Sequence, residues 1–437
     1  MTIWTSEQLS FPSISRRKVE ADFEGGDVSS DGGVLLLRQM ERRLKLTHTL
    51  AERLPDPREP AACEHTLVDL LRQRIYGIAL GYEDGNDHLR LRQDVALQTA
   101  VDRVDELASP ATLCRWENRA DRKVAGIVRD GRIEQFIASH KKAPQERILD
   151  FDATDETVHG KQEGRFFHGY YDHDCFLPLC VFGGTPLLVS YLRPSNRDSA
   201  RHAWAVLSLL VKRLRKAWPK AKIILRGDSG FCRWRMMRWC DRHGVFYGLG
   251  LAQNSRWNLM AGKHLERARR QHEKTGKPQR FFKELKYAAQ TWDKKRRVIL
   301  RREHNEKGGN PRYIVTNLED AAEHQYDNVY CARGEMENRI KEQPLDLFSD
   351  RTRCTKGWAN QFRLLLSSLA YGLVETLRRV GLKKTELARA TCGTIRLKLF
   401  KIGAGLLRNT RRIRLHRSSA YPYGELFHRV CQRLSTA

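Results

Sequence analysis

The most constraining feature of this chain is a short apolar run that ends in carboxylates, residues 147–155 (RILDFDATD). Its aliphatic and aromatic residues are typical of a buried strand, whereas Asp150 and Asp152 are costly to bury without partners. Hard divalent cations such as Mg2+ prefer oxygen ligands from carboxylates, phosphates and water. Two interpretations stay open for these residues alone: a metal site, or aspartates that cap the following turn.

The charge of the chain favours a polyanionic partner. Its 437 residues include 79 Lys and Arg against 52 Asp and Glu, which gives a formal net charge of +27. Hydrophobic residues at 41% are enough for a folded core, so a disordered protein is excluded. Nucleic acid is the commonest large polyanion that such a positive field attracts. A generic basic protein with solvated charged faces is the alternative.

The cysteines and the apolar runs indicate in which cellular compartment the protein is expected. Ten cysteines include no CxxC pair, which argues against zinc-thiolate and disulfide frameworks and favours a reducing cytoplasm. The N-terminal residues lack the pattern of a signal peptide. The longest apolar run, residues 364–377, is too short to span a membrane. We therefore predict a cytoplasmic protein with no membrane partner.

Residue periodicity predicts an α/β protein whose mixed sheet is flanked by helices. The predicted parts are a mostly helical, DNA-binding N-terminal domain (1–145), a core in two segments (146–251 and 327–385), a β-rich antiparallel insertion (252–326) and a basic helical C-terminal region (386–437).

Two local predictions concern helix boundaries. Residues 86–101 are predicted to form one helix. A later helix begins near Tyr330 and is predicted to end at Pro344, because proline lacks a backbone N–H and clashes with the preceding turn.

Three carboxylates are predicted at the ends of separate core elements. Asp152 follows the first strand, Asp228 follows the strand at residues 222–226, and Glu337 lies on the late helix. Strand ends are where α/β sheets usually build their sites. Two divalent ions held about 3.5–4 Å apart by such acids activate water and stabilise the leaving oxygen of a phosphodiester.

Several residues are candidates for DNA contact. Tyr330, Arg333 and Lys341 share a helix face with Glu337. Arg115 lies on a short helix capped by Ser109, which is either a recognition helix or structural filler. Arginines of the tail suit phosphate contact, the alternative being a solvated basic tail; the cluster is Arg408, Arg411, Arg412, Arg414 and Arg417.

Two tryptophans of the basic insertion, Trp257 and Trp292, have two possible roles. An aromatic ring there could stack on a base flipped out of the duplex. Packing of the insertion's own small core is the alternative interpretation.

The combination of motifs resembles bacterial insertion-sequence transposases of the DDE class, nearest to the family typified by insertion sequence 1380. The resemblance covers most of the chain and rests on motifs in a fixed order: residues 30–33 (SDGG), 149–155 (LDFDATD), 159–160 (HG), 171–179 (YDHDCFLPL), 226–231 (RGDSGF) and 337–342 (ENRIKE).

This resemblance implies an RNase H-like core that uses Mg2+, with Mn2+ as a substitute and two ions in the site. It implies cleavage of double-stranded DNA at the element's ends, strand transfer into target DNA, and a homodimer or larger assembly on paired ends in the bacterial nucleoid. Asp152, Asp228 and Glu337 match the DDE triad. The Tyr-x2-Arg-x3-Glu-x6-Lys signature is matched except at its Lys, where Pro344 stands, so Lys341 is the candidate substitute.

Two other functions stay open. One is a structure-specific nuclease that uses the same core without joining DNA ends. The other is a domesticated DNA-binding regulator with an inactive core, although such a protein has no use for three intact carboxylates.

Overall fold

The computed structural model describes residues 9–158, 160–253, 255–306 and 308–435, without the side chains of 255–261 and 263–265. The described chain divides into two compact units. The central unit is Asn118–Ser368, and the terminal unit combines the residues up to Glu117 with those from Leu369 onwards. The division falls inside the long helix α13 (Gly357–Val380). The five predicted parts of the chain stay predictions, although compactness groups residues 118–145 with the sheet.

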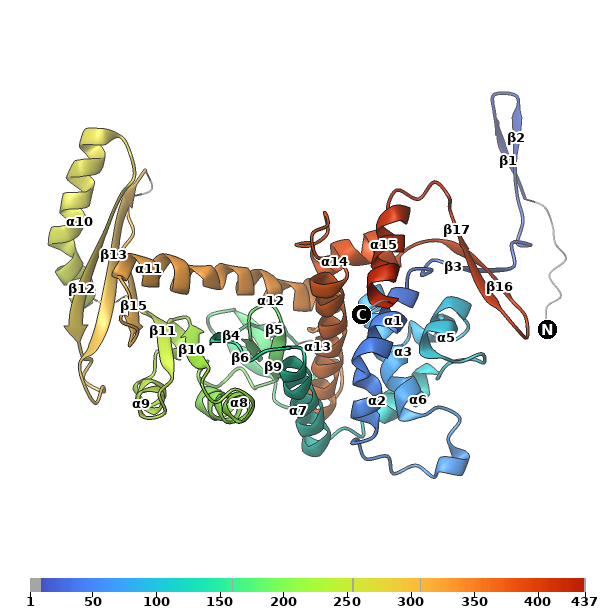
Figure 1. Ribbon diagram of the computed structural model, residues 1–437, viewed down its shortest axis with the longest axis horizontal. Helices are drawn as coiled ribbons and strands as arrows, with labels where there is room; N and C mark the ends of the chain where they lie inside the picture. The colour runs from blue at the N-terminus through green and yellow to red at the C-terminus, as the bar shows by residue number, and fades with distance from the viewer. Residues whose placement is uncertain (1–8, 159, 254, 307, 436–437) are drawn as a thin grey trace. The chain divides into compact units, whose positions relative to one another are not determined.

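A mixed sheet forms the centre of the central unit (Figure 1). Within the described residues its strands run in the order β12-β13-β15-β11-β10-β4-β8-β9, with β14 beside β13. Their bounds are β4 (Glu146–Ala153), β8 (Leu179–Phe182), β9 (Leu187–Tyr191), β10 (Lys222–Gly227), β11 (Phe246–Leu251), β12 (Gln279–Tyr287), β13 (Arg296–Asn305), β14 (Gly308–Gly309) and β15 (Arg312–Thr316). Strands β4, β10 and β11 are parallel, whereas β8 pairs antiparallel with β4 and β9 pairs antiparallel with β8.

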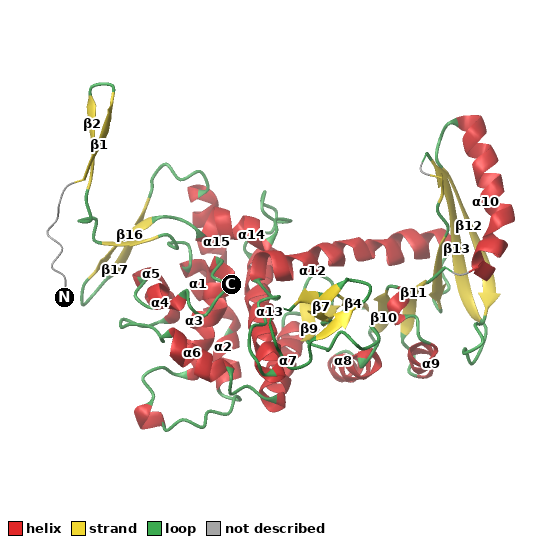
Figure 2. Cartoon of the chain, turned by 180° about the vertical axis from the view of Figure 1, so that it is seen from behind, coloured by secondary structure: helices red, strands yellow, loops and turns green. Residues whose placement is uncertain are grey.

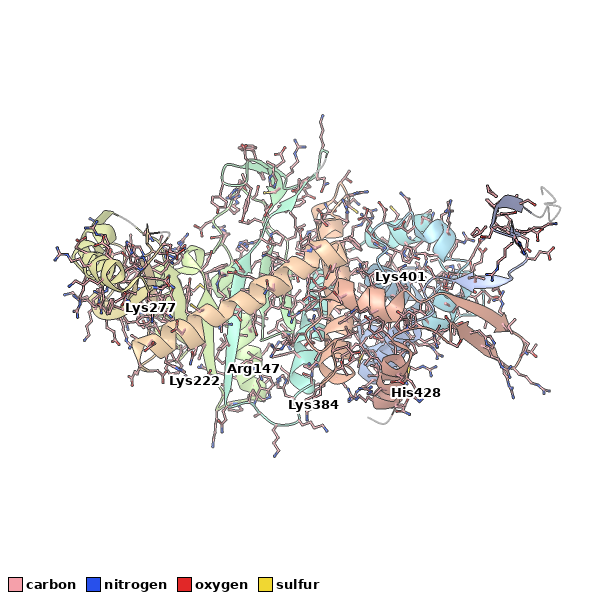
Figure 3. The ribbon with its side chains drawn as sticks, turned by 90° about the horizontal axis from the view of Figure 1, so that it is seen from above. Arg147, Lys222, Lys277, Lys384, Lys401 and His428 are labelled. Atoms are coloured by element: carbon pink, nitrogen blue, oxygen red, sulfur yellow. The ribbon has the colours of Figure 1, made fainter. Side chains whose placement is uncertain are left out.

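Helices cover both faces of this sheet, which confirms the predicted mixed α/β class. The helices of the central unit, besides the first part of α13, are α7 (Arg122–Ala138), α8 (Ala203–Ala217), α9 (Trp234–Arg242), α10 (Ser255–Thr275), α11 (Ala322–His324) and α12 (Gly334–Leu347). Apolar side chains of α7, α8 and α9 pack with those of β4 and β10 in one continuous core. Helix α12 crosses the opposite face of the sheet (Figures 1 and 3).

The insertion contains a long helix that its prediction as a β-rich segment did not include. Residues 255–275 form helix α10, which runs alongside β12 and β13 (Figure 2). Strands β12, β13 and β15 are antiparallel, as predicted for this segment, and β15 also pairs with β11, so they extend the central sheet. The pairing satisfies backbone groups that an exposed β11 edge would leave unpaired.

A smaller antiparallel sheet lies beyond the end of β4. It contains β5 (Glu156–Thr157), β6 (Phe166–His168) and β7 (His173–Phe176) in the order β5-β7-β6. In Figure 3 this green segment projects on the side of the central unit away from Arg147 and Lys222, which mark the starts of β4 and β10.

The terminal unit is mostly helical and is built from both ends of the chain. Its helices, besides the last part of α13, are α1 (Leu35–Leu44), α2 (Leu46–Ala51), α3 (Leu67–Leu80), α4 (His88–Leu91), α5 (Val95–Val101), α6 (Pro110–Glu117), α14 (Cys392–Ile395) and α15 (Gly424–Ser435). Its strands are β1 (Leu9–Ile14), β2 (Arg17–Ala21), β3 (Asp27–Ser29), β16 (Ala404–Arg408) and β17 (Ile413–Arg417).

The motif at residues 30–33 joins the two ends of the chain inside the terminal unit. Gly32 and Gly33 donate backbone hydrogen bonds to the carbonyls of Ile402 (2.8 Å) and Phe400 (3.1 Å). A Cβ atom on Gly33 would lie 1.8 Å from the carbonyl oxygen of Leu399, so no larger residue fits there without a backbone shift. The glycines are thus required by a close approach of two backbones.

Three predictions of local structure are wrong. Pro344 does not end α12, which continues to Leu347, because its last turn buries Gln343 and Leu347 against the unit. Residues 86–101 form α4 and α5, since the Asp94 carboxylate accepts a hydrogen bond from the Leu97 N–H and starts a new helix. The basic C-terminal region is only partly helical, because β16 and β17 form a hairpin there.

Candidate active site

Two of the predicted carboxylates lie at the same edge of the central sheet. In the parallel pair β4 and β10, Asp150 is level with Arg226 and Phe151 with Gly227. Continuing this register by one residue sets Asp228 beside Asp152. Asp228 also accepts a hydrogen bond at Oδ1 from the backbone N–H of Gly230 (2.9 Å), which fixes the turn that leaves β10. The strand register therefore brings both acids together.

A buried ion pair lies directly below these acids. Arg226 Nη2 donates to Asp150 Oδ2 at 2.7 Å, and the Arg226 Nε pairs with the other carboxylate oxygen. The Asp150 side chain is only 2% exposed. Arg226 Nη1 also donates to the carbonyl of Val329 (2.5 Å), in the helical segment that leads to α12. One guanidinium thus joins β10 to β4 and to the segment that carries the third predicted acid.

Sequence reasoning did not assign a role to Arg226. The available signal is an arginine in the apolar run at residues 223–226, paired with an aspartate in the apolar run at residues 148–151. Two opposite charges in core strands need each other, because a buried charge without a partner is costly.

Arg333 links the first predicted acid to the third. Its Nη1 lies 3.0 Å from Asp152 Oδ2, and its Nη2 pairs with Glu337 Oε1 one turn further along α12. Although burial lowers the pKa of the Arg333 guanidinium, the charges of Asp152 and Glu337 raise it above its usual value. The side chain of Asp152 is 16% exposed and that of Glu337 is 47% exposed. Arg333 is thus half-buried between two carboxylates of unequal exposure.

The electrostatics of Asp152 reflect all three acids. Burial raises the pKa of its carboxyl to about 6; Arg333 opposes this shift, and the charges of Asp228 and Glu337 add to it. A carboxyl in this state ionises reluctantly unless a further cation joins the site.

We expect Asp152 to make folding stability depend on pH. Its raised pKa favours the protonated, folded form, so the stabilisation is complete below about pH 4 and is lost as pH rises through about 6. In metal-free buffer, the parent should lose free energy of unfolding as pH rises from 4 to 7.5, whereas Asp152→Asn lacks the titrating group. The free energy of unfolding of Asp152→Asn relative to the parent should therefore increase by up to about 3 kcal/mol over this range. Urea unfolding of both proteins at the two pH values measures this difference. A constant difference across that range would contradict the prediction.

The three carboxylates are the kind of ligand that a hard divalent cation prefers. Asp152, Asp228 and Glu337 offer carboxylate oxygens, which Mg2+ prefers, and the guanidinium of Arg333 shows that a cation is accommodated between two of them. Among the described residues, no group of three His, Cys, Asp or Glu side chains is already arranged around a common metal position. Arg333 would have to release Asp152 or Glu337 for both to bind one ion.

The remaining residues of the predicted signature lie near these acids or on the same helix. A Cβ atom on Gly250 would lie 2.6 Å from the Tyr330 hydroxyl oxygen and 3.1 Å from the Asp228 carbonyl carbon, so the missing side chain makes room for the tyrosine. Burial raises the pKa of the Tyr330 hydroxyl. Lys341 is exposed on α12.

The predicted DNA contacts of the terminal unit are exposed. Arg115 lies on α6, where its Nη2 donates to Thr112 Oγ1 at 3.3 Å. The exposed arginines at the tip of the β16–β17 hairpin are Arg411, Arg412 and Arg414. Arg408 and Arg417 from the same cluster instead hold the hairpin to the unit, through the carbonyls of Val104 (3.0 Å) and Gly32 (2.6 Å).

The two tryptophans of the insertion differ in what the structure describes. Trp292 is half-buried against the main core and lies edge-on to Tyr287, with ring centroids 5.5 Å apart. Trp292 therefore packs against the main core of the central unit and not against a separate core of the insertion, and base stacking by this ring stays a prediction. The side chain of Trp257 lies outside the described residues, so base stacking by this ring stays a prediction.

Comparisons with known proteins bear on the whole chain. Residues 11–437 match the family model described as transposase DDE domain group 1. Among solved structures, the chain is similar to piggyBac transposase in a synaptic complex with hairpin DNA, with 10% sequence identity and a TM-score of 0.43. That similarity covers 85% of this chain and 79% of the other. No curated protein matches the sequence.

Proposed function

We propose that this chain, which belongs to the family described as transposase DDE domain group 1, cleaves DNA at the ends of its mobile element and joins them to target DNA. The observation that carries the proposal is the convergence of three acids, with Asp152 and Asp228 on adjacent strand ends and Arg333 bridging Asp152 to Glu337. Membership of the family typified by insertion sequence 1380, and a bacterial source, are finer predictions that follow from the motifs.

The topology of the sheet supports an RNase H-like core. Strands β9, β8 and β4 are antiparallel neighbours, and β10 and β11 then continue parallel to β4. Along the chain the elements of this core follow in the order β4, β8, β9, α8, β10, α9 and β11. This arrangement supplies acids from two strand ends and leaves one face for α12, the helix that carries Glu337.

In this proposal Asp152, Asp228 and Glu337 would hold Mg2+, or Mn2+ in its place, and two ions are expected. A bound divalent ion lowers the pKa of a water nucleophile and stabilises the leaving oxygen of a phosphodiester. Arg333 bridges Asp152 and Glu337 in the metal-free chain; on metal binding it would release one of them and, with Tyr330 and Lys341, is proposed to contact DNA phosphates. Asp228 stays oriented by its hydrogen bond from Gly230.

The surface that supports double-stranded DNA binding most directly is the β16–β17 hairpin. Arg408 and Arg417 fasten it to the terminal unit, while Arg411, Arg412 and Arg414 are exposed. A two-stranded ribbon is narrow enough to enter the major groove of DNA. Arg115 on α6 is a second proposed contact, and pairing of two ends would require a homodimer or larger assembly.

We expect the three exposed hairpin arginines to contribute phosphate contacts. Changing Arg411, Arg412 and Arg414 together to Ala should weaken duplex binding and make the slope of log K against log salt shallower by about three. The matching triple Lys variant keeps the charges and should keep the slope. Fluorescence anisotropy at several salt concentrations measures both. An unchanged slope in the Ala variant would remove the hairpin from the proposed interface.

The test of the proposed function uses DNA that carries the inverted repeats flanking this gene. Nicking that requires Mg2+ or Mn2+, followed by joined products with target DNA, is the expected result. Nicking without joining would instead identify a structure-specific nuclease. Specific binding without nicking would identify a regulator with an inactive core.

A further inference from the structure

The β6–β7 hairpin carries large aromatic side chains in solvent close to the candidate active site. Tyr170, in the turn, is 86% exposed, and Phe167 on β6 is 61% exposed. The hairpin belongs to the green segment that projects from the central unit in Figure 3. The proposed metal ligands and phosphate contacts make no use of these rings, and water around large exposed rings is unfavourable.

A series of rings leads from the tip of the hairpin back towards the acids. The Tyr170 ring meets the Tyr171 ring edge-on with centroids 5.0 Å apart, and Tyr171 lies 4.9 Å from His168 and 6.1 Å from His173. His173 Nε2 then lies 3.1 Å from Asp155 Oδ2. Asp155 follows Asp152 by three residues, so the series ends beside the site.

The charges of nearby acids also affect the pKa of the Tyr171 hydroxyl. Burial raises its pKa to about 12, and the charges of Asp155 and Asp152 contribute to the shift. This ring is therefore within electrostatic reach of the first candidate metal ligand, in agreement with the ring geometry.

The hairpin is held in place at its base. Ser195 Oγ donates to the carbonyl of Phe166 at 2.7 Å. Glu163 accepts from the backbone N–H of Gly357 at 2.8 Å, and its own N–H donates to the carbonyl of Thr355 at 3.1 Å. A rigid base preorganises the rings at the tip, so binding there would cost little conformational entropy.

We propose that Tyr170, with Phe167, stacks on unpaired nucleobases of the DNA next to the cleavage point. This inference rests on the proposed function, because it takes DNA as the substrate of the adjacent acids. Every base has a π face, so exposed rings bind unpaired strands with little dependence on sequence. Lys161, exposed before the hairpin, adds a positive charge for the backbone of the same strand.

A second copy of this chain is the competing occupant of the rings. The net charge of +27 of the whole chain opposes the approach of a second copy and favours a polyanionic partner. The phenol and imidazole groups of these rings also carry polar atoms that need hydrogen-bond partners. A nucleobase that stacks in contact with water supplies such partners, whereas an apolar contact between two subunits does not.

The experiment compares two DNA probes with the full chain. One is a blunt duplex of the element's end, and the other is the same duplex with a short unpaired extension that carries 2-aminopurine. We expect the parent protein to prefer the extended probe and to quench its fluorescence. The double variant Tyr170→Ala/Phe167→Ala should lose about tenfold in affinity for the extended probe and keep its affinity for the blunt one.

Controls separate stacking from other effects of the substitutions. Tyr170→Phe keeps a ring and should keep the preference, and Phe23→Ala removes an equally exposed ring (87%) of the terminal unit without effect. Full preference and quenching in the double variant would overturn the inference. A shift from dimer to monomer in sedimentation, with the preference intact, would overturn it in favour of a subunit contact.

The proposed function has a separate readout. Metal-dependent nicking of the blunt duplex by the parent protein, together with no preference for the extended probe, would overturn the stacking role and leave the proposed function standing. Failure of the parent protein to bind or nick either probe would overturn both.

Discussion

Replacing Glu337 with Gln is expected to lower metal-dependent nicking by a factor on the order of 10²–10³, as loss of one charge-stabilising group in an active site typically does. The amide keeps the size of the side chain but removes the charge that pairs with Arg333 and that would bind a cation. The Glu337 side chain is 47% exposed, so folding should be unaffected. Nicking of end-containing DNA in Mg2+, with circular dichroism as a check on folding, measures both.

Glu335 provides a matched control for this prediction. It is an exposed glutamate in the same first turn of α12, so its change to Gln removes the same charge from the same helix N-terminus. Arg333 bridges Asp152 to Glu337, and Glu335 has no part in that bridge. Glu335→Gln should therefore nick DNA normally. If Glu335→Gln is inactive and Glu337→Gln active, the assignment of the third acid is wrong.

The sequence was sufficient to predict the strands of the site because their signals are local. Residues 148–151 and 222–227 are short apolar runs, and an acid follows each of them. The structure places these runs as neighbouring parallel strands, so Asp152 and Asp228 meet at one edge. The link from Asp152 to Glu337 through Arg333 depends on tertiary packing across 181 residues of chain, and periodicity carries no such information.

The insertion shows where local reasoning ends. Its β-rich character was predicted, but the partner of β15 is β11 of the central sheet, and a strand's own residues do not specify its partner. The α12 boundary was missed for a related reason. The local cost of Pro344 is offset by burial of Leu347, which only the fold reveals.

The buried pair of Arg226 and Asp150 predicts the largest loss of stability. Arg226→Ala would leave the Asp150 carboxylate, 2% exposed, without its cation, and removal of one partner of such a pair costs about 3–5 kcal/mol. It would also remove the donor to the Val329 carbonyl, which anchors the segment before Arg333. Urea unfolding should therefore show a much lower midpoint, and nicking should fall with the folded fraction.

An exposed pair near the same site supplies the control, because Arg233 Nη2 and Asp198 Oδ2 are also close, at 2.6 Å, but their side chains are 45% and 53% exposed. Arg233→Ala should cost about 1 kcal/mol of stability or less, since water screens such pairs.

The double variant Asp150→Leu/Arg226→Met removes both buried charges and should recover most of the stability. It should still nick DNA poorly, because the register of β4 and β10 and the position of Arg333 lose their shared anchor. Equal losses of stability in Arg226→Ala and Arg233→Ala would mean that burial does not set the strength of the buried pair. Full nicking activity in the double variant would show that the three acids are positioned without that pair.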